Sequence, residues 1–296
     1  MNFKPIFIVG VGRSGTSLLQ GMLNSHQEIA FPPETHFIRN YLSKVHSIEF
    51  ESLKEKILND ENLLKLGISL SDVFRISNSL DDFYKNLLIE YKKESGAKFI
   101  GDKDPKNIEY LKLIHSVFPN AIVIHIYRDP RAVIASRMIA KWSKNRPFWQ
   151  HILAYKSQIS YGQKIGKTLF SNYIEVKYED LLMSPEEELK KICNVINVKF
   201  ELDMINFFQN SNEIVQGKER EWKENIFKPI MIENINKWKL SLSKRQIEVI
   251  ELLLSNEMNQ FNYKSCSSMN NLNIIKNSFM ILWISLANIL YLMRLK

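Results

Sequence analysis

Residues 5–24 read PIFIVGVGRSGTSLLQGMLN, and this stretch decides the fold. Residues 5–9 form an apolar run that predicts a buried parallel strand. The glycine-rich segment after them leads into LLQGMLN, whose apolar spacing suits a helix packed on a sheet. A strand, a glycine-rich turn and a helix in this order bring backbone N–H groups together around an anion. The stretch therefore predicts an anion-binding loop at the start of an α/β domain.

Three further apolar runs have the character of companion strands, at residues 98–101, 121–127 and 173–178, and helical patterns separate them. This alternation predicts a P-loop-like, doubly wound α/β fold of three layers, with a central, mostly parallel sheet flanked by helices. The binding crevice of such a sheet lies at the carboxyl ends of its strands. Residues 37–95 show helical periodicity without a convincing strand, which predicts a helical insert or cap.

The composition limits the class of protein. The chain has 296 residues, 45% of them hydrophobic, which excludes disordered and fibrous proteins. Its net charge of +8 suits an anionic partner: a nucleotide, a nucleic acid or a lipid headgroup. Cys193 and Cys266 lie too far apart in sequence to indicate a disulfide framework or a cysteine metal site. The apolar run at the N-terminus is too short for a signal peptide, so we expect a cytoplasmic protein.

The loop after the first strand has the Gly10-x4-Gly15 spacing of a Walker A loop. Thr16 and Ser17 follow, however, so the Lys that reaches the β- and γ-phosphates is missing, and Arg13 supplies a cation instead. An ordinary strand-to-helix turn with an exposed Arg would have the same pattern. Other segments have to decide between the two interpretations.

A second candidate segment is AIVIHIYRDPRAVIASRMIAK at residues 121–141. A buried strand ends here at Arg128, and Asp129 with Pro130 begins a helix that carries Ser136. Because Arg128 sits on the strand end, it and Ser136 can point at one anion. The segment indicates a second anion site beside the first loop, with a solvated basic helix N-terminus as the alternative.

The pair GVGRSGTSLL and IYRDPRAVIAS, in this order, resembles the sulfotransferases that use 3′-phosphoadenosine-5′-phosphosulfate (PAPS), especially the protein-tyrosine and bacterial enzymes. The resemblance implies that the first loop holds the 5′-phosphosulfate of the donor and the second segment its 3′-phosphate, with 3′-phosphoadenosine-5′-phosphate (PAP) as the product. It implies the first role for Arg13, Ser14, Gly15, Thr16 and Ser17, and the second for Arg128 and Ser136.

Three later segments follow the order of the same family, so the resemblance extends from about residue 6 to about residue 260. GDKDPKN at residues 101–107 implies that Lys103 lies near the sulfuryl group. VKYEDLLMSPEEEL at residues 176–189 implies that Tyr178 lies near the cofactor. FKPIMIENINKW at residues 227–238 resembles the late cofactor-covering loop and implies a phosphate contact for Lys228.

Sulfuryl transfer is an in-line displacement that needs cations near the leaving oxygen and a base for the acceptor proton. Arg13 and Lys103 are the candidate cations. Glu34, in FPPETHF at residues 31–37, occupies the position of the catalytic Glu of the protein-tyrosine sulfotransferases, although a carboxylate at a helix N-terminus is an alternative interpretation. His36 is the alternative base, at a position where the tyrosine enzymes carry Arg. The histidines lack metal-ligand spacing, and we expect no metal.

The C-terminal part of the chain differs from the rest in composition, with a polar stretch followed by an apolar one. We expect a sulfotransferase domain at residues 1–263, a Ser- and Asn-rich linker at residues 264–273, and an apolar helix at residues 274–296. Its core, residues 278–293, would span roughly 24 Å as a helix, short of the about 30 Å of a hydrocarbon layer. Association with a membrane surface, docking on the domain and docking on a second subunit in a homodimer all remain open.

The sequence thus predicts a PAPS-dependent sulfotransferase that acts on an acceptor hydroxyl or an amine. The acceptor stays open among saccharide, peptide, lipid and small metabolite, with Trp142 and Trp149 as candidates for the acceptor mouth. One alternative is a P-loop-type nucleotide kinase or NTPase, which the missing Walker Lys opposes. Another is a non-enzymatic anion-binding module for nucleic acid or acidic lipid. The ordered motifs oppose it, and its aromatic residues do not interleave with a basic stripe, so we expect no nucleic-acid partner.

Overall fold

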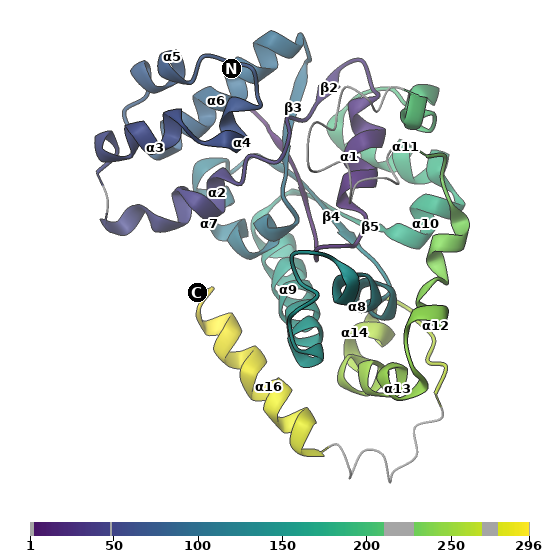
Figure 1. Ribbon diagram of the computed structural model, residues 1–296. Coiled ribbons are helices and arrows are strands. Elements are labelled where there is room, and N and C mark those ends of the chain that lie inside the picture. The colour runs from purple at the N-terminus through teal and green to yellow at the C-terminus, as the bar shows by residue number, and fades with distance from the viewer. Residues whose placement is uncertain (1–2, 48, 210–227, 268–277, 296) are drawn as a thin grey trace.

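The computed structural model describes residues 3–47, 49–209, 228–267 and 278–295. Its centre is a five-stranded sheet with the strand order β2-β3-β1-β4-β5 (Figure 1). Every neighbouring pair of strands is parallel. The strands are β1 (Ile6–Val9), β2 (Ile29–Ala30), β3 (Phe99–Lys103), β4 (Ile122–Tyr127) and β5 (Asn172–Lys177). The predicted fold class is confirmed.

Side chains of alternate strand residues enter different cores, because successive residues of a strand point to opposite faces of a sheet. In β1, Ile6 and Ile8 pack in one hydrophobic cluster, whereas Phe7 and Val9 pack in another. Both clusters are closed to solvent, so β1 is apolar at every position. This burial on both faces explains why the strand appears in the sequence as an uninterrupted apolar run.

Helices cover both faces of the sheet and give the fold its three layers. On one face lie α1 (Thr16–Asn24), α10 (Tyr178–Met183) and α11 (Pro185–Ile196). On the other lie α6 (Leu80–Ser95), α7 (Leu111–Val117) and α9 (Phe148–Leu169). Two short helices at the strand ends, η3 (Pro105–Tyr110) and α8 (Pro130–Ile139), begin beside the carboxyl edge of the sheet.

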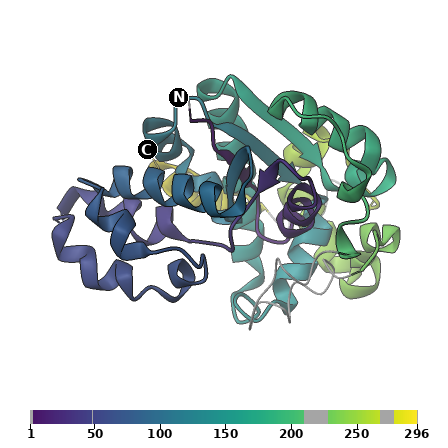
Figure 2. The ribbon, with the colours of Figure 1, turned by 90° about the horizontal axis from the view of Figure 1, so that it is seen from above.

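The segment from residue 37 to residue 95 lies to one side of the sheet (Figure 2). Its α-helices are α2 (Phe37–Asn40), α3 (Lys54–Leu58), α4 (Glu61–Leu64), α5 (Leu70–Arg75) and α6. Local signals define α6: the Ser79 side chain accepts a hydrogen bond from the Asp82 N–H at its start, and Gly96 at its end has φ +68°. The described residues of this segment contain no strand, as the sequence predicts.

The later part of the chain adds α12 (Trp238–Ser241), α13 (Lys244–Leu253), α14 (Ser255–Gln260) and α16 (Ser278–Met293). Figure 1 shows α16, in yellow, alongside α9. The predicted linker at residues 264–273 lies mostly outside the described residues. Among the helices of the described ranges, none combines the length and the apolar character that a bilayer crossing requires.

Candidate functional site: a basic pocket at the carboxyl edge of the sheet

The loop between β1 and α1 has a backbone suited to an anion. Arg13 has φ +84° and Gly15 has φ +102°, both in the left-handed region that turns successive N–H groups to one side. A Cβ on Gly15 would lie 2.4 Å from Cδ2 of Tyr178, so this position has no room for a side chain. Thr16 begins α1, whose first N–H groups have no intrahelical acceptor. The loop can therefore cradle a phosphate or a sulfate.

Arg13 and Arg128 lie next to one another at this loop. Arg128 donates a hydrogen bond from Nη1 to the Arg13 carbonyl at 3.4 Å and from Nη2 to the Asn234 carbonyl at 2.7 Å. Its guanidinium lies 4.2 Å from the centre of the Tyr178 ring, in a cation–π contact. Arg13 donates from Nε to the Ser136 hydroxyl at 2.9 Å. The segments at residues 10–17 and 121–141 thus meet, as the sequence predicts.

Among the described residues, the carboxylate of Glu179 interacts with the charge of Arg128 but forms no ion pair with it. In the part of the chain that the structure describes, neither Arg13 nor Arg128 forms an ion pair. Burial, and then the neighbouring Arg128 guanidinium, lower the pKa of Arg13. Nε of Arg128 is buried and has no partner among the described residues. Two adjacent guanidinium groups, neither of them in an ion pair, favour an anionic ligand.

The opposite wall of the pocket is an acidic cluster held by cations. Lys103, at the end of β3, is fully buried, forms a close ion pair with Glu34 and donates to the Ser17 hydroxyl at 3.2 Å. The Nδ1 atom of His36 lies 2.8 Å from Oδ2 of Asp104 and 3.8 Å from Oε2 of Glu34. His36 has φ +53°, a left-handed conformation that directs its ring to this cluster. Glu34 and His36 therefore face the same space as the loop.

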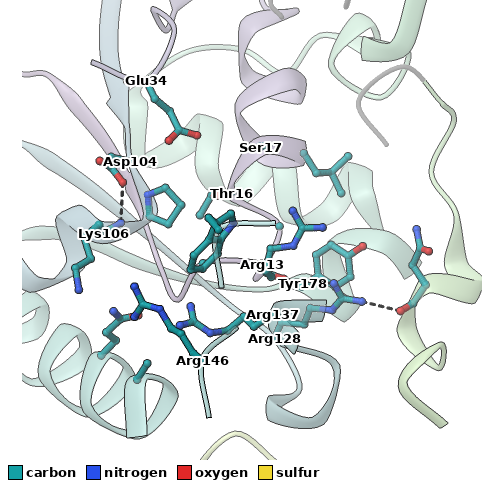
Figure 3. Close-up of a pocket in the computed structure, with 18 of the residues that line it drawn as sticks. Arg13, Thr16, Ser17, Glu34, Asp104, Lys106, Arg128, Arg137, Arg146 and Tyr178 are labelled. Atoms are coloured by element: carbon teal, nitrogen blue, oxygen red, sulfur yellow. Dashed lines mark hydrogen bonds between the residues drawn. The ribbon is translucent and has the colours of Figure 1, made fainter. Parts of the chain in front are cut away.

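One cavity of about 780 Å³ joins the loop, the arginines and the acidic wall (Figure 3). The predicted site residues that line it are Arg13, Gly15, Thr16, Ser17, Glu34, His36, Arg128 and Tyr178. Ser14, Lys103 and Ser136 do not line it: Ser14 and Lys103 are buried behind the wall, and Ser136 acts through Arg13. Lys228 is exposed and outside the lining, although the neighbouring residues 229–231 belong to it. Trp142 and Trp149, the predicted mouth residues, line the pocket.

Several lining residues were missed by the sequence analysis: Arg39, Asp104, Lys106, Arg137, Arg146 and Tyr291. Asp104 and Lys106 follow Lys103 in a motif that the sequence singles out, so their position at a strand end was a usable signal. Arg137 follows Ser136 directly, but its orientation depends on how α8 packs. Tyr291 comes from α16, and the sequence offers no signal that this helix reaches the pocket.

Within the described ranges, the acidic wall is the place where potential metal-ligand atoms lie close together. Single ligand atoms of Glu34, His36 and Asp104 lie within 4.8 Å of one another. Lys103 pairs with Glu34, and Arg39 Nε lies 3.4 Å from Oδ2 of Asp104. These two cations already balance the carboxylates, and their charge disfavours a metal cation at this place.

Comparisons with known proteins show which sequences and structures this chain is similar to. A family model described as "Sulfotransferase family" matches residues 5–202. Protein-tyrosine sulfotransferase 1 of Danio rerio is 25% identical over 265 residues, covering 84% of this chain and 70% of that protein. The protein-tyrosine sulfotransferase of Drosophila melanogaster is 25% identical over 246 residues, covering 79% of this chain and 46% of that protein. This chain thus spans less than half the length of the fly protein.

Solved structures with the same fold include two sulfotransferase domains of larger biosynthetic systems. The domain from the curacin biosynthetic pathway has a TM-score of 0.63 at 21% identity and covers 86% of this chain and 98% of that one. The domain from the Synechococcus PCC 7002 olefin synthase has a TM-score of 0.62 at 22% identity and covers 84% of this chain and 94% of that one. At these identities the likeness concerns the fold.

Proposed function

Because this chain belongs to the sulfotransferase family, we propose that it moves the sulfuryl group of PAPS to an acceptor hydroxyl, or to an amine, and releases PAP. The observation that carries the proposal is the pair of adjacent guanidinium groups of Arg13 and Arg128, neither of which forms an ion pair with a described residue, at the glycine-rich loop. A bisphosphorylated donor needs two anion sites in one pocket. This pair supplies one cation for each.

In the proposed complex, the loop amides hold the 5′-phosphosulfate together with Arg13, Gly15, Thr16 and Ser17, while the buried Ser14 supports the loop from behind. Arg128 holds the 3′-phosphate, Ser136 orients Arg13 through their hydrogen bond, and Lys228 is a further phosphate contact from the covering loop. Tyr178 stacks on Arg128 and fixes the direction of its guanidinium. Support comes from the cavity that these loops enclose and from the unpartnered Nε of Arg128.

Bound PAPS supplies the sulfuryl group, and the chain supplies orientation, charge and a base. We assign the base role to Glu34, whose carboxylate accepts the proton of the attacking hydroxyl. Lys103 orients Glu34 through their ion pair and holds Ser17 by a hydrogen bond. Arg13 balances the negative charge that develops on the leaving oxygen. His36, held by Asp104, is the alternative base. The proposal requires no metal ion.

The acceptor enters, in this proposal, between Trp142 and Trp149. The relatives in the animal lineages are named protein-tyrosine sulfotransferases, so a peptide tyrosine is one candidate, beside a saccharide, a lipid and a small metabolite. His36 stands where the tyrosine enzymes carry Arg, which opposes a simple transfer of their acceptor to this chain. We propose a cytoplasmic location, which the free thiols of Cys193 and Cys266 support because a reducing compartment keeps thiols unpaired.

We also propose that α16 brings the enzyme to an anionic lipid surface. One face of the helix packs on the domain, where Ile284 is 1% exposed. The other carries Leu282, Leu286, Ile289, Leu290 and Met293, all more than half exposed. Their spacing follows one helical face, and Arg294 adds a positive charge at its end. A second copy of the chain in a homodimer is the competing occupant of this face.

Titration calorimetry with PAP, with Mg²⁺-ATP and with an unrelated oligonucleotide separates the candidate functions. We expect PAP to bind most tightly. Preference for Mg²⁺-ATP would replace the proposal by a nucleotide kinase or NTPase, and preference for the oligonucleotide would replace it by a non-enzymatic binding module. Extracts incubated with ³⁵S-labelled PAPS then identify the acceptor as the compound that becomes labelled.

The base assignment has its own test. Glu34→Gln keeps the size of the side chain and removes its basicity, so we expect PAP binding to stay within about two-fold and turnover to fall roughly 10²–10⁴-fold. His36→Gln, measured beside it, should reduce turnover less. If Glu34→Gln turns over normally and His36→Gln does not, the base role passes to His36.

A further inference from the structure

The C-terminal helix α16 is held to the domain along one face. Ile284 is 1% exposed, and the side chain of Asn288 accepts a hydrogen bond from the Ser157 hydroxyl at 2.6 Å. The Tyr291 hydroxyl donates to the buried carboxylate of Glu109. The three positions of α16 in these contacts follow the spacing of one helical face. The domain therefore fixes the direction in which the opposite, outer face of α16 points.

Tyr291 makes α16 a part of the pocket. Its hydroxyl shares the Glu109 carboxylate with the side chains of Lys106 and Gln158. Tyr291, Lys106 and Gln158 all line the pocket. Burial, and then the charge of Glu109, raise the pKa of Tyr291, so the phenol stays neutral and keeps its proton on the carboxylate. One buried carboxylate thus joins three elements of the pocket wall: η3, α9 and α16.

The same wall leads to the proposed base. The backbone N–H of Lys106 donates to Oδ1 of Asp104 at 2.9 Å, and Oδ2 of Asp104 lies 2.8 Å from Nδ1 of His36. That nitrogen lies 3.8 Å from Oε2 of Glu34. Figure 3 shows Lys106, Asp104 and Glu34 on the same side of the pocket. An acceptor group that passes Tyr291 therefore meets the residues proposed to take up its proton.

The outer face of α16 continues to the pocket through two tryptophans. At about 100° per residue, Trp283 lies between the inner and the outer face of the helix, and it is 37% exposed. It packs edge-to-face on Trp149, with ring centroids 4.3 Å apart, and Trp149 lines the pocket. Leu286 and Leu290, each 55% exposed, follow one and two turns after Trp283 on the outer side. An apolar path thus leads from the outer surface of α16 to the pocket.

The thickness of α16 brings the pocket wall close to the headgroups of a membrane. A helix with its side chains is about 10–12 Å across. An amphipathic helix on a membrane buries its apolar face about 5–10 Å into the boundary between headgroups and acyl chains. The inner face of α16, where Tyr291 lines the pocket, then lies within several ångströms of the headgroups. A headgroup can enter the pocket while the acyl chains of the same lipid stay in the membrane.

We infer that the acceptor is a membrane lipid with a hydroxyl on a projecting headgroup, and that it enters the pocket along Trp283 and Trp149. This inference rests on the proposed function, from which it takes both the sulfuryl transfer and the lipid-facing side of α16. The headgroup oxygen forms a bond to sulfur while the bond from sulfur to the phosphate oxygen of PAPS breaks. The hydroxyl proton passes to Glu34, and PAP leaves.

The class of the acceptor can be determined from the fraction that becomes labelled. An extract of cells that contain the protein, membranes included, is incubated with ³⁵S-labelled PAPS and separated into chloroform-soluble lipid, precipitated protein and water-soluble compounds. The same extract with Glu34→Gln provides the blank. We expect the transferred label in the lipid fraction. Label in the protein or in new water-soluble compounds would overturn the inference in favour of a peptide, or of a saccharide or metabolite.

Two variants test the path along α16. Total lipid of the same cells, reformed as vesicles, replaces the extract. The double variant Leu286→Ser and Leu290→Ser removes apolar contacts with the membrane, so we expect its labelling of lipid to fall at least about ten-fold, with PAP affinity within about two-fold of the unaltered protein. Leu240→Ser changes a leucine on α12 that is 94% exposed, and should label lipid normally.

The other outcomes separate the inference from the proposals beneath it. Normal labelling of lipid by the double variant, a change from dimer to monomer in that variant, or loss of its PAP affinity would each overturn the path along α16. Absence of PAP binding by the unaltered protein would be a failure of the donor site. PAP binding without label in any fraction would be a failure of the proposed sulfuryl transfer.

Discussion

Arg13 and Arg128 can be tested one side chain at a time, because each is proposed to hold a different end of PAP. We expect Arg13→Ala and Arg128→Ala each to weaken PAP binding by about 10- to 100-fold, since a hydrogen bond to a charged group contributes about 1.5–3 kcal/mol. Calorimetry gives the affinities, and Arg75→Ala is the matched control on the surface. Unchanged affinity in both pocket variants would remove the support for the donor site.

Gly15 allows a second test at the level of a single residue. Gly15→Ala introduces a left-handed alanine and brings its Cβ 2.4 Å from the Tyr178 ring. Gly67 has φ +69° with nothing within 4 Å of the added Cβ, so Gly67→Ala introduces the backbone strain without the contact. We expect Gly67→Ala to lower the free energy of unfolding by roughly 1–2 kcal/mol and to leave PAP binding unchanged.

We expect Gly15→Ala to lower the free energy of unfolding further and to weaken PAP binding at least about ten-fold, because Tyr178 has to move away from the loop and from Arg128. Urea denaturation and PAP titration of both variants give the comparison. Equal effects of the two substitutions on both measurements would mean that the contact between the loop and Tyr178 is unimportant.

The individual residues of the site were only partly predictable from the sequence. The loop residues and Arg128 follow directly from their positions at strand ends, where a parallel sheet brings side chains together. The indirect position of Ser136 behind Arg13 and the burial of Lys103 behind Glu34 depend on side-chain packing, which periodicity does not encode. Arg137 had no identifiable signal for the same reason: the rotation of α8 decides whether it points into the pocket or to solvent.

The sheet carries two buried groups with opposite pKa shifts, one on β3 and one on β4, the strands that flank β1. Burial raises the pKa of Asp102, on β3, to about 6, and lowers the pKa of His125, on β4, to about 4. Asp102 accepts hydrogen bonds from Tyr84 and Asn107. The Nδ1 atom of His125 lies 2.6 Å from the Tyr173 hydroxyl, while its Nε2 has no described partner.

The two shifts have opposite effects on stability. Because the pKa of Asp102 is raised in the folded protein, the group stabilises the fold at pH values below 3.8, the pKa of an ordinary Asp. This stabilisation is lost as the pH rises through about 6. The lowered pKa of His125 gives a contribution that is present above 6.5 and lost as the pH falls through about 4. Each group changes the free energy of unfolding by about 3 kcal/mol. Between pH 4 and pH 7 the two changes have opposite signs and nearly cancel.

Asp102→Asn should uncover the contribution of His125. We expect the free energy of unfolding of this variant to fall by about 3 kcal/mol between pH 7 and pH 4, relative to the unaltered protein over the same interval. Urea denaturation at each pH measures it. Asp81→Asn, at an exposed position, is the control and should follow the unaltered protein. A pH dependence that is the same in Asp102→Asn and Asp81→Asn would contradict the opposing shifts.

At the level of elements, the sequence predicts the strands and helices that are long and have a strong apolar pattern. The strands β1, β3, β4 and β5 and the helices α9 and α11 lie where their apolar patterns predict them. The strand β2 was missed, because two residues at a sheet edge, Ile29 and Ala30, are too few to show a period. The apolar pattern of residues 243–260 is that of a single helix, but the structure divides it into α13 and α14 at Leu254, a boundary without Gly or Pro to mark it.

At the scale of the whole molecule, α16 packs beside α9 and adds a wall to the pocket, which Tyr291 lines. Its inner face packs on α9, where the Ser157 hydroxyl donates to Asn288 at 2.6 Å and Trp149 meets Trp283. Docking on the domain was one of the alternatives that the sequence left open, since an apolar segment of this length fits lipid, a second subunit and its own domain equally well. Only tertiary packing distinguishes the inner face from the outer one.

The outer face of α16 gives a prediction for the whole protein. We expect it to co-sediment with vesicles of phosphatidylcholine and phosphatidylglycerol more than with vesicles of phosphatidylcholine alone, because apolar burial and attraction to anionic lipid act together. The double variant Leu286→Ser and Leu290→Ser should lose most of this binding. Leu240→Ser, which changes an exposed leucine on α12, should keep it.

Light scattering of the same proteins tests the competing occupant of this face. A dimer that becomes a monomer in the double variant, together with no vesicle binding, would assign the outer face of α16 to a second copy of the chain. A monomer that binds neither vesicle type would leave the lipid proposal without support.

The surplus of guanidinium groups in the pocket has a practical consequence for anyone who handles the enzyme. Inorganic sulfate and phosphate carry the charge and shape that these groups hold, so we expect ammonium sulfate left from precipitation, or a phosphate buffer, to compete with the donor. Activity measured in such media will be too low, and exchange into a zwitterionic buffer will restore it.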